Sequence, residues 1–240
     1  MNTPAGLERC LSFINCQMQP PERPVLFGEP TAYKCAITIS RESGCGAHAF
    51  SEKLVQYLQP RNAPDAPPWT VFDKNLVQQV LEEHQLPSRL ARFMPEDRVL
   101  EIDDIMDELF GLCPASWTLV QQISETILHL VEIGNVIILG RGANIVTAKL
   151  PHVLHVRMIG SAKRRINNMQ CFEGVRLKEA SDRIHHEDLG RQRYVKKHFN
   201  KDIDDPLLYH VVINTDLVSL EEAVPMIGEL ALKRKIPVAA

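Results

Sequence analysis

Three observations predict an α/β fold for this chain of 240 residues. Short apolar runs rich in β-branched residues alternate with longer segments that show helical periodicity. The run at 136–139 is apolar throughout, which is typical of a central parallel strand covered on both faces. Glycines or charged residues follow several of these runs, at the strand ends where parallel sheets bind ligands. We therefore predict a three-layer, doubly wound domain around a five-stranded parallel sheet.

In the first half of the chain, the first predicted strand is a β-branched run at 36–40. It is followed by a glycine pair and then by an amphipathic helix at 47–58. Four prolines between 60 and 68 predict a surface loop. The elements expected after this loop are, in order, a strand at 69–73, a helix at 75–84, two short helices within 88–110, and a longer helix that Ser116 caps and Gly134 ends.

The second half continues the same alternation. Its expected elements are a strand at 136–139, a brief helix after 140–144, a strand at 153–158, helices at 161–170 and 176–200, a strand at 211–214, and a last helix ending near Lys235. Ser219 and Glu222 stand in capping-box spacing at the start of that last helix. Gly190 is expected to interrupt the helix at 176–200 and to act as a hinge.

Composition excludes several classes of protein. A net charge of -3 gives no electrostatic case for general nucleic-acid binding. The start of the sequence lacks the pattern of a secretory leader, and no run of apolar residues is long enough to span a membrane. The six cysteines show no C-x-x-C pair, so free thiols are expected rather than a zinc site. We therefore expect a cytoplasmic protein with neither a nucleic acid nor a membrane as partner, and homo-oligomerisation is left open.

The loop after the first strand, residues 41–46, is here called the opening loop. Gly44 and Gly46 permit close backbone approach, and the amides of 44–48 can point at an anion at the start of the following helix. The alternative is a tight turn between strand and helix that binds nothing. Cys45 lies where a helix N-terminus favours a thiolate, but no partner histidine is identifiable, so we interpret it as a small loop-filling residue.

Two further segments carry groups suited to an anionic ligand. Arg141 leaves the end of the strand at 136–139 between two glycines and can reach a phosphate bidentately; the alternative is a surface ion pair. The helix at 176–200 carries a basic tract in which Arg183 and Arg191 lie near one face, whereas Arg193 lies on another. The alternative for this tract is a solvated basic face. The binding interpretation is favoured because all three segments would serve one ligand.

Several ordered motifs resemble the cytidylate kinase-like family, over roughly residues 35 to 232. They are the strand and loop from Ile37 to Gly46, Phe72-Asp73-Lys74, the G-R-G-A-N segment at 140–144, the strand from Val153 to Arg157, the lid-like helix to Phe199 and the segment from Asp204 to Tyr209. The resemblance implies a P-loop nucleoside-monophosphate kinase fold. It also implies transfer of the ATP γ-phosphoryl group to a nucleoside monophosphate or another small phosphorylated acceptor, with ATP and Mg²⁺ required.

The resemblance further divides the chain and assigns its residues. An N-terminal extension (1–33) would precede a kinase-like domain (34–236), which contains a helical acceptor-binding insertion (75–115) and a lid-like helix (175–205). The implied donor-phosphate residues are Ser43, Gly44, Cys45, Gly46, Ala47 and His48. The implied substrate-binding residues are Arg41, Asp73, Arg141 and Asp188. Arg183, Arg191 and Arg193 would be catalytic, neutralising charge during transfer, and no protein residues are assigned as metal ligands.

The opening loop departs from the usual phosphate loop. Ala47 and Ala49 stand where such loops carry their lysine and their hydroxyl, and His48 is the basic residue nearest to those positions. A second hypothesis therefore stays open, a catalytically weak or inactive nucleotide or phosphate sensor. A third is an interaction protein whose contacts come from residues 1–33 and the acidic helix at 101–108.

Overall fold

Five parallel strands form the central sheet of the protein, in the order β3-β4-β2-β5-β6. The structure is a computed structural model that describes residues 33–62, 66–73, 105–106, 109, 118–234 and 236–237. The strands of the sheet are β2 (Ala36–Arg41), β3 (Thr70–Phe72), β4 (Val136–Leu139), β5 (Val153–Ile159) and β6 (Val211–Asn214). All five strands predicted from the sequence are thus confirmed.

Strand β2 lies in the middle of the sheet, and its register explains where the opening loop emerges. Ala36 pairs with Val136 of β4 and with Val153 of β5. The pairing with β4 ends at Ile39, whereas Arg41 still pairs with Met158 of β5. The chain crosses to the β3 side after β2 and to the β6 side after β4, so the loop leaves the sheet at its topological switch point.

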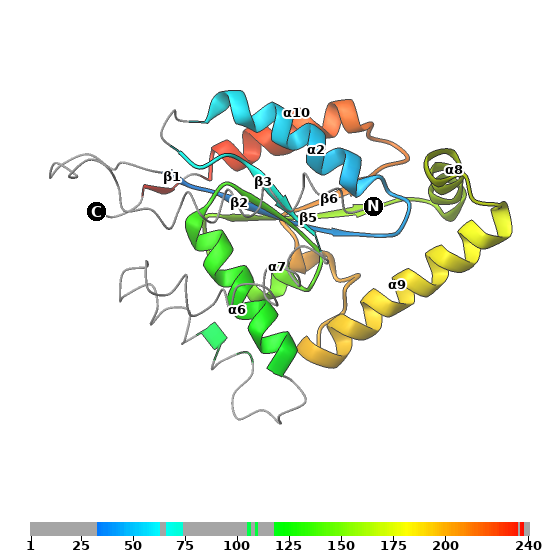
Figure 1. The fold of residues 1–240 in the computed structure, drawn as a ribbon, viewed down its shortest axis with the longest axis horizontal. Helices are drawn as coiled ribbons and strands as arrows, with labels where there is room; N and C mark the ends of the chain where they lie inside the picture. The colour runs from blue at the N-terminus through cyan, green and yellow to red at the C-terminus, as the bar shows by residue number, and fades with distance from the viewer. Residues whose placement is uncertain are drawn as a thin grey trace, which may run out of the picture.

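Helices cover both faces of the sheet (Figure 1). The helices α2 (Ala47–Leu58) and α10 (Leu220–Leu232) lie on one face, and α6 (Thr118–Ile133) and α7 (Ala143–Val146) lie on the other. This is the three-layer arrangement that the sequence predicts. Short β1 (Tyr33–Lys34) pairs antiparallel with β7 (Ile236–Pro237) in a separate two-stranded sheet, which the sequence did not indicate.

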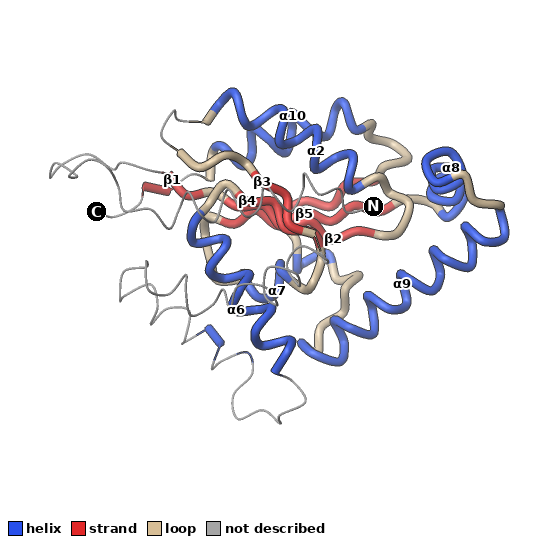
Figure 2. Tube along the Cα trace, viewed as in Figure 1, coloured by secondary structure: helices blue, strands red, loops and turns tan. Residues whose placement is uncertain are grey.

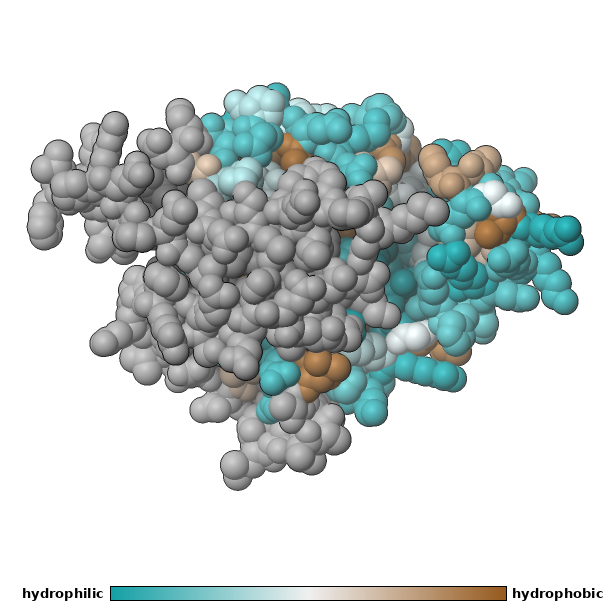
Figure 3. Space-filling view, viewed as in Figure 1, coloured by the Kyte–Doolittle hydropathy of each residue, from teal (hydrophilic) through white to brown (hydrophobic). Residues whose placement is uncertain are grey.

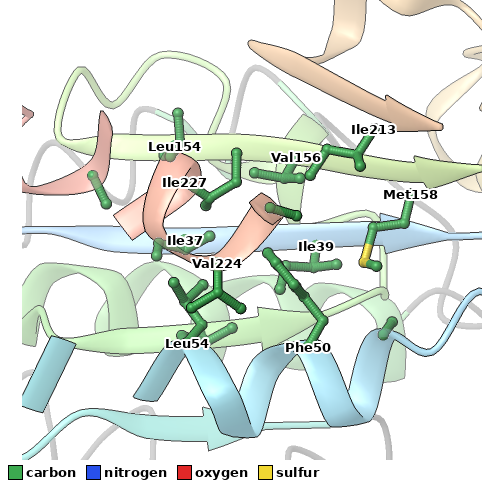
Figure 4. Close-up of a cluster of buried hydrophobic side chains, with 14 of the residues drawn as sticks. Ile37, Ile39, Phe50, Leu54, Leu154, Val156, Met158, Ile213, Val224 and Ile227 are labelled. Carbon is green, nitrogen blue, oxygen red and sulfur yellow. The ribbon is translucent and has the colours of Figure 1, made fainter. Parts of the chain in front are cut away.

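The core between the sheet and the helices α2 and α10 is formed by aliphatic and aromatic side chains (Figure 4). Ile37 and Ile39 are two residues apart on β2, so their side chains point to the same face of the sheet. They contact Phe50 and Leu54, which are one turn apart on α2. Fully burying such a side chain stabilises the fold by about 1.5–3 kcal/mol. The first strand and the helix after the opening loop are therefore held rigidly relative to each other.

Two helix boundaries confirm the signals read from the sequence. Gly134, with φ of 87°, follows the last residue of α6. The capping box of α10 is present, since the Ser219 hydroxyl accepts from the Glu222 amide and the Glu222 carboxylate accepts from the Ser219 amide. The cap predicted at Ser116 lies outside the described residues, as do residues 1–32 of the extension (1–33), the helix at 75–84 and most of the insertion (75–115).

The helices α8 (Ala162–Glu173) and α9 (Leu177–Phe199) form an arm beside the sheet (Figure 2). The described residues on the side of the arm present a mostly hydrophilic surface (Figure 3). The expected interruption at Gly190 is wrong, because α9 continues through it. A single glycine costs a helix interior only about 1 kcal/mol relative to alanine, so the flanking turns keep the helix intact.

The remaining elements are two short 3₁₀ turns, η1 (Gln59–Arg61) and η3 (Pro206–Leu208). In the described part of the chain, no helix is both long and apolar enough to cross a membrane.

Candidate functional site

A cleft of about 790 Å³ opens at the carboxyl ends of β2, β3 and β4. The opening loop forms one wall, the segment 139–142 after β4 forms a second, and α9 closes the third side. Asp73, the residue after β3, also lines this cleft. The three segments singled out in the sequence therefore meet around one space.

The opening loop presents a helix N-terminus to the cleft. Gly46, with φ of 76°, is the N-cap of α2, and as a glycine it has no side chain to cap the first turn of the helix. Uncapped amides at a helix start attract anions. Gly44, with φ of 84°, is required for a different reason, because a Cβ atom there would stand 2.5 Å from the Arg165 carbonyl oxygen of α8.

Arginines from three segments line the cleft and supply its positive charge. They include Arg41 at the end of β2, Arg141 after β4 and Arg191 of α9. Burial, together with the neighbouring charges of Arg191 and Arg141, lowers the pKa of Arg41 to about 10, against opposing effects of Asp73 and Glu187. Neighbouring positive charges destabilise the charged form of a guanidinium, and a bound anion offsets this repulsion. The electrostatics of the cleft thus favour a phosphate or a similar group.

The segment carrying Arg141 is shaped by its glycines. Gly140, Arg141 and Gly142 all adopt positive φ, at 79°, 57° and 69°. A Cβ atom at Gly142 would stand 2.5 Å from the ring of Phe199, the last residue of α9. Arg141 Cζ lies 5.8 Å from the ring centroid of Tyr194, whose pKa is raised by burial. Because Gly142 has no side chain, the end of α9 can pack directly on this segment.

Polar side chains fasten α9 to the opening loop. The Ser43 amide donates to Asp188 Oδ1 at 2.8 Å, and the Ser43 hydroxyl donates to Glu187. Arg165 of α8 donates to Asp188 Oδ2 at 2.5 Å and to the Ser43 carbonyl at 3.1 Å. Arg191 contributes hydrogen bonds to Asp188, at 2.6 Å, and to the Ser43 hydroxyl.

Arg157 on β5 holds Ser40, a residue of the cleft lining, in place. This arginine is buried, donates to the Ser40 hydroxyl at 2.9 Å, and forms an ion pair with Asp204. The Tyr209 hydroxyl donates to the Ile203 carbonyl at 2.8 Å and lies 3.3 Å from Ser40 Oγ. These contacts tie the segment before β6 to the end of β2.

Cys45 is buried in the opening loop, as its interpretation as a small loop-filling residue predicts. Burial raises the pKa of this thiol to about 11, so the helix N-terminus does not produce a thiolate here. The helix N-terminus does not offset the desolvation of a side chain that is 2% exposed. His48 lies near Arg41, and burial, with the charge of Arg41, lowers its pKa. Ala47 is buried, and no charge comes from its position.

Most of the residues implied by the resemblance gather at the cleft. Its lining includes Arg41, all of Ser43 to His48, Asp73, Arg141, Arg183 and Arg191. Asp188 is not part of the lining itself, but it accepts a hydrogen bond from the amide of Ser43, which is. Arg193 is exposed and is not part of the lining. Arg183 also pairs with Glu173 at 2.5 Å and with Glu187 at 3.1 Å.

Sequence reasoning missed four polar side chains that shape the site. They are Arg157, Arg165, Asn168, which donates to the Gly44 carbonyl at 2.8 Å, and Glu187. Arg157 had a usable signal, since it is a charged residue near the carboxyl end of a strand. The other three act on residues more than 100 positions away, which spacing along the chain cannot reveal.

The described residues fit an anion better than a resident metal. They contain no group of three His, Cys, Asp or Glu side chains placed to hold a metal ion. Magnesium commonly needs only one or two carboxylates, because substrate phosphates and water complete its shell. Asp73 and Glu42 are among the carboxylates of the cleft lining that would face a phosphate-bound Mg²⁺.

Solved structures with a similar fold cover most of the chain. An uncharacterized protein from Eubacterium ventriosum is 19% identical, with a TM-score of 0.54 over 83% of this chain and 99% of that one. Shikimate kinase from Bacteroides thetaiotaomicron is 14% identical, with a TM-score of 0.42 over 82% of this chain and 97% of that one. The first of these supports the fold assignment.

A comparison with curated proteins finds no match. The family model of the cytidylate kinase-like family matches residues 36–217, from the first residue of β2 to beyond the end of β6. This match spans the opening loop, Arg141, the arm and the segment before β6, which are the elements that build the cleft. The chain belongs to the cytidylate kinase-like family.

Proposed function

We propose that the protein is a phosphotransferase that moves the γ-phosphoryl group of ATP to a nucleoside monophosphate or another small phosphorylated acceptor. The observation that carries this proposal is the convergence of Arg41, Arg141 and Arg191 on one cleft beside an uncapped helix start. Phosphoryl transfer depends mainly on positioning and on stabilising charge, which such a set of donors supplies.

Each part of the cleft has a proposed role in the reaction. The amides at the start of α2 would hold the donor phosphates, and Arg141 would hold the acceptor phosphate. An acceptor phosphate oxygen would bond to the γ-phosphorus while the bond to the ADP oxygen breaks, so that ADP leaves. Arg191 and Arg41 would neutralise charge that develops on the transferring group. The insertion (75–115) would contact the acceptor base, and the segment 175–205 would act as the lid.

A coupled assay that detects ADP, run over a panel of nucleoside monophosphates with ATP and Mg²⁺, tests this proposal. Arg141→Ala is expected to reduce kcat/KM by about 100-fold or more, because it removes a bidentate phosphate contact. Arg164→Ala is the matched control, since this arginine of α8 is exposed, lies outside the cleft lining and has no assigned role. If no acceptor in the panel led to the formation of ADP from ATP, the phosphotransferase proposal would be overturned.

The second candidate is a nucleotide or phosphate sensor with little or no turnover. It is favoured by Ala47 and Ala49, which stand where phosphate loops carry lysine and a hydroxyl. Calorimetry separates the two candidates. Tight ATP binding without ADP release favours the sensor, whereas an absence of any nucleotide binding argues against both.

A further inference from the structure

Two consecutive acids of α9, Glu187 and Asp188, bind the opening loop from the side of the arm. Asp188 accepts three hydrogen bonds, from the Ser43 amide at 2.8 Å, from Arg191 at 2.6 Å and from Arg165 at 2.5 Å. A backbone amide and two guanidiniums are also the donors that proteins use to bind phosphate oxygens. The carboxylate thus occupies a set of donors suited to a phosphate.

Both acids are charged when they make these contacts. Burial raises the pKa of Asp188, but hydrogen bonds from Arg191, Ser43 and Arg165 outweigh it and hold the pKa below its ordinary value. The pKa of Glu187 is also lowered, because hydrogen bonds from Ser43 and Arg183 outweigh the opposing effect of burial. The opening loop is therefore already bound to anionic groups of its own chain.

The donors in question belong to the cleft. Ser43 and Arg191 both line it, and Arg191 is the arginine whose charge, after burial, most lowers the pKa of Arg41. The Ser43 N–H has a single hydrogen to donate, and two anions that share Arg191 repel each other. A phosphate that takes these donors must displace the carboxylates.

We propose that Glu187 and Asp188 form an internal anion that competes with the phosphates of a nucleotide for Ser43 and Arg191, so that ligand binding releases this contact. The proposal rests on the proposed function, because it assumes that the cleft binds phosphates. Glu187 keeps a partner on release, since Arg183 on the preceding turn of α9 holds it at 3.1 Å. The exchange therefore leaves fewer unpaired charges than the loss of an isolated ion pair.

Asp188→Ala tests the competition, with Asp182→Ala as the matched control. Asp182 is an exposed acid on the same helix, so its removal makes the same change in net charge without touching the loop. Two measurements are needed on each protein. One is the exchange rate of the Ser43 amide hydrogen without ligand, and the other is the Kd for ATP and for inorganic triphosphate by calorimetry.

Asp188→Ala is expected to speed exchange at Ser43 and to lower both Kd values by about tenfold or more, because a charged acceptor no longer competes. Asp182→Ala is expected to change neither measurement. Glu187→Gln, which keeps the shape of the side chain, is expected to tighten binding in the same direction and guards against a folding defect in the first variant.

Three results would overturn the proposal in distinguishable ways. Unchanged exchange at Ser43 would show that the carboxylate does not hold the loop in solution. Faster exchange with weaker binding would make Asp188 a positioning residue for the ligand instead of a competitor. Faster exchange in a protein that binds neither ATP nor triphosphate would overturn the proposed function itself, and the competition with it.

Discussion

Gly140 and Arg41 lie so close together that a Cβ atom at Gly140 would stand 2.2 Å from Arg41 Nη1. The glycine belongs to the segment after β4, and the arginine ends β2, so two adjacent strands deliver them to the same place. The absence of a side chain at Gly140 is what makes room for the guanidinium at the wall of the cleft.

The first prediction concerns this contact. Gly140→Ala is expected to destabilise the protein by about 1–2 kcal/mol through its positive φ and to displace Arg41 from the cleft. Triphosphate affinity is then expected to fall about tenfold, as a charge-assisted contact is lost. Gly174→Ala is the control, since its φ is also positive, at 68°, but no atom lies within 4 Å of the added Cβ. Urea unfolding and calorimetry measure the two effects, and equal triphosphate affinities of the two variants would refute the role of Gly140.

The second prediction concerns the ion pair of Arg157 and Asp204. Asp204→Asn is expected to destabilise the fold by about 1–3 kcal/mol, because Arg157 is buried and loses its charged partner. Gln192 of α9 also donates to Asp204 at 3.0 Å, so the change loosens the arm as well.

A double-mutant cycle with Arg157→Met isolates the pair from these side effects. The coupling energy from urea unfolding is expected to be about 1 kcal/mol or more. A coupling indistinguishable from zero would mean that Ser40, not Asp204, is the partner that matters for Arg157.

The third prediction concerns pH. His155 is buried between Thr38, whose Oγ1 lies 2.9 Å from its Nδ1, and the stacked ring of His210. Burial lowers the pKa of His155 from 6.5 to about 3. The unfolded chain therefore takes up a proton between these values while the folded chain does not, so stability falls as pH decreases from about 6.5 toward 3, with a slope of up to about 1.4 kcal/mol per pH unit from this residue.

His155→Gln is expected to remove this part of the pH dependence, which urea unfolding at pH 7, 6, 5 and 4 measures. His185→Gln, a change at an exposed histidine of α9, is the control. Parallel stability curves for His155→Gln and the unchanged protein would contradict the burial argument.

The fourth prediction concerns the thiols. Cys45 is buried with a pKa of about 11, whereas Cys171 on α8 is exposed. At pH 8 only about one Cys45 thiol in a thousand is ionised, and the thiolate is the reactive form. Iodoacetamide is expected to modify Cys171 far faster than Cys45, as read by peptide mass spectrometry. Urea should abolish the difference, and comparable labelling rates in the folded protein would show that the loop opens readily.

The fold was readable from the sequence because its signals are local. The β-branched run of β2, the apolar run of β4 and the capping box at Ser219 each act within a few residues. Arg141 was readable for the same reason, since a glycine on each side marks it. The interruption predicted at Gly190 was wrong, because helix continuity depends on all the turns of α9 and not on one residue.

The interior of the site was not readable, because its contacts join distant parts of the chain. No local pattern near Ser43 indicates that Asp188, 145 residues later, accepts a hydrogen bond from its amide. The high pKa of Cys45 was not readable on the same ground, since a helix start is visible in the sequence and the burial that opposes its effect is not.

The apolar contacts of α9 determine how the helix can move when its acids leave the loop. Ile184 packs with Met169 of α8 in one buried cluster, and Val195 packs with Ile145 and Ile203 in another. Residues 185–194 thus form a helical span about 15 Å long that is held at both ends and crosses the cleft. Gly190, near the middle of this span, places no side chain in the way of bending. Ligand entry would therefore bow the centre of α9 while its ends stay seated, instead of swinging the whole helix away.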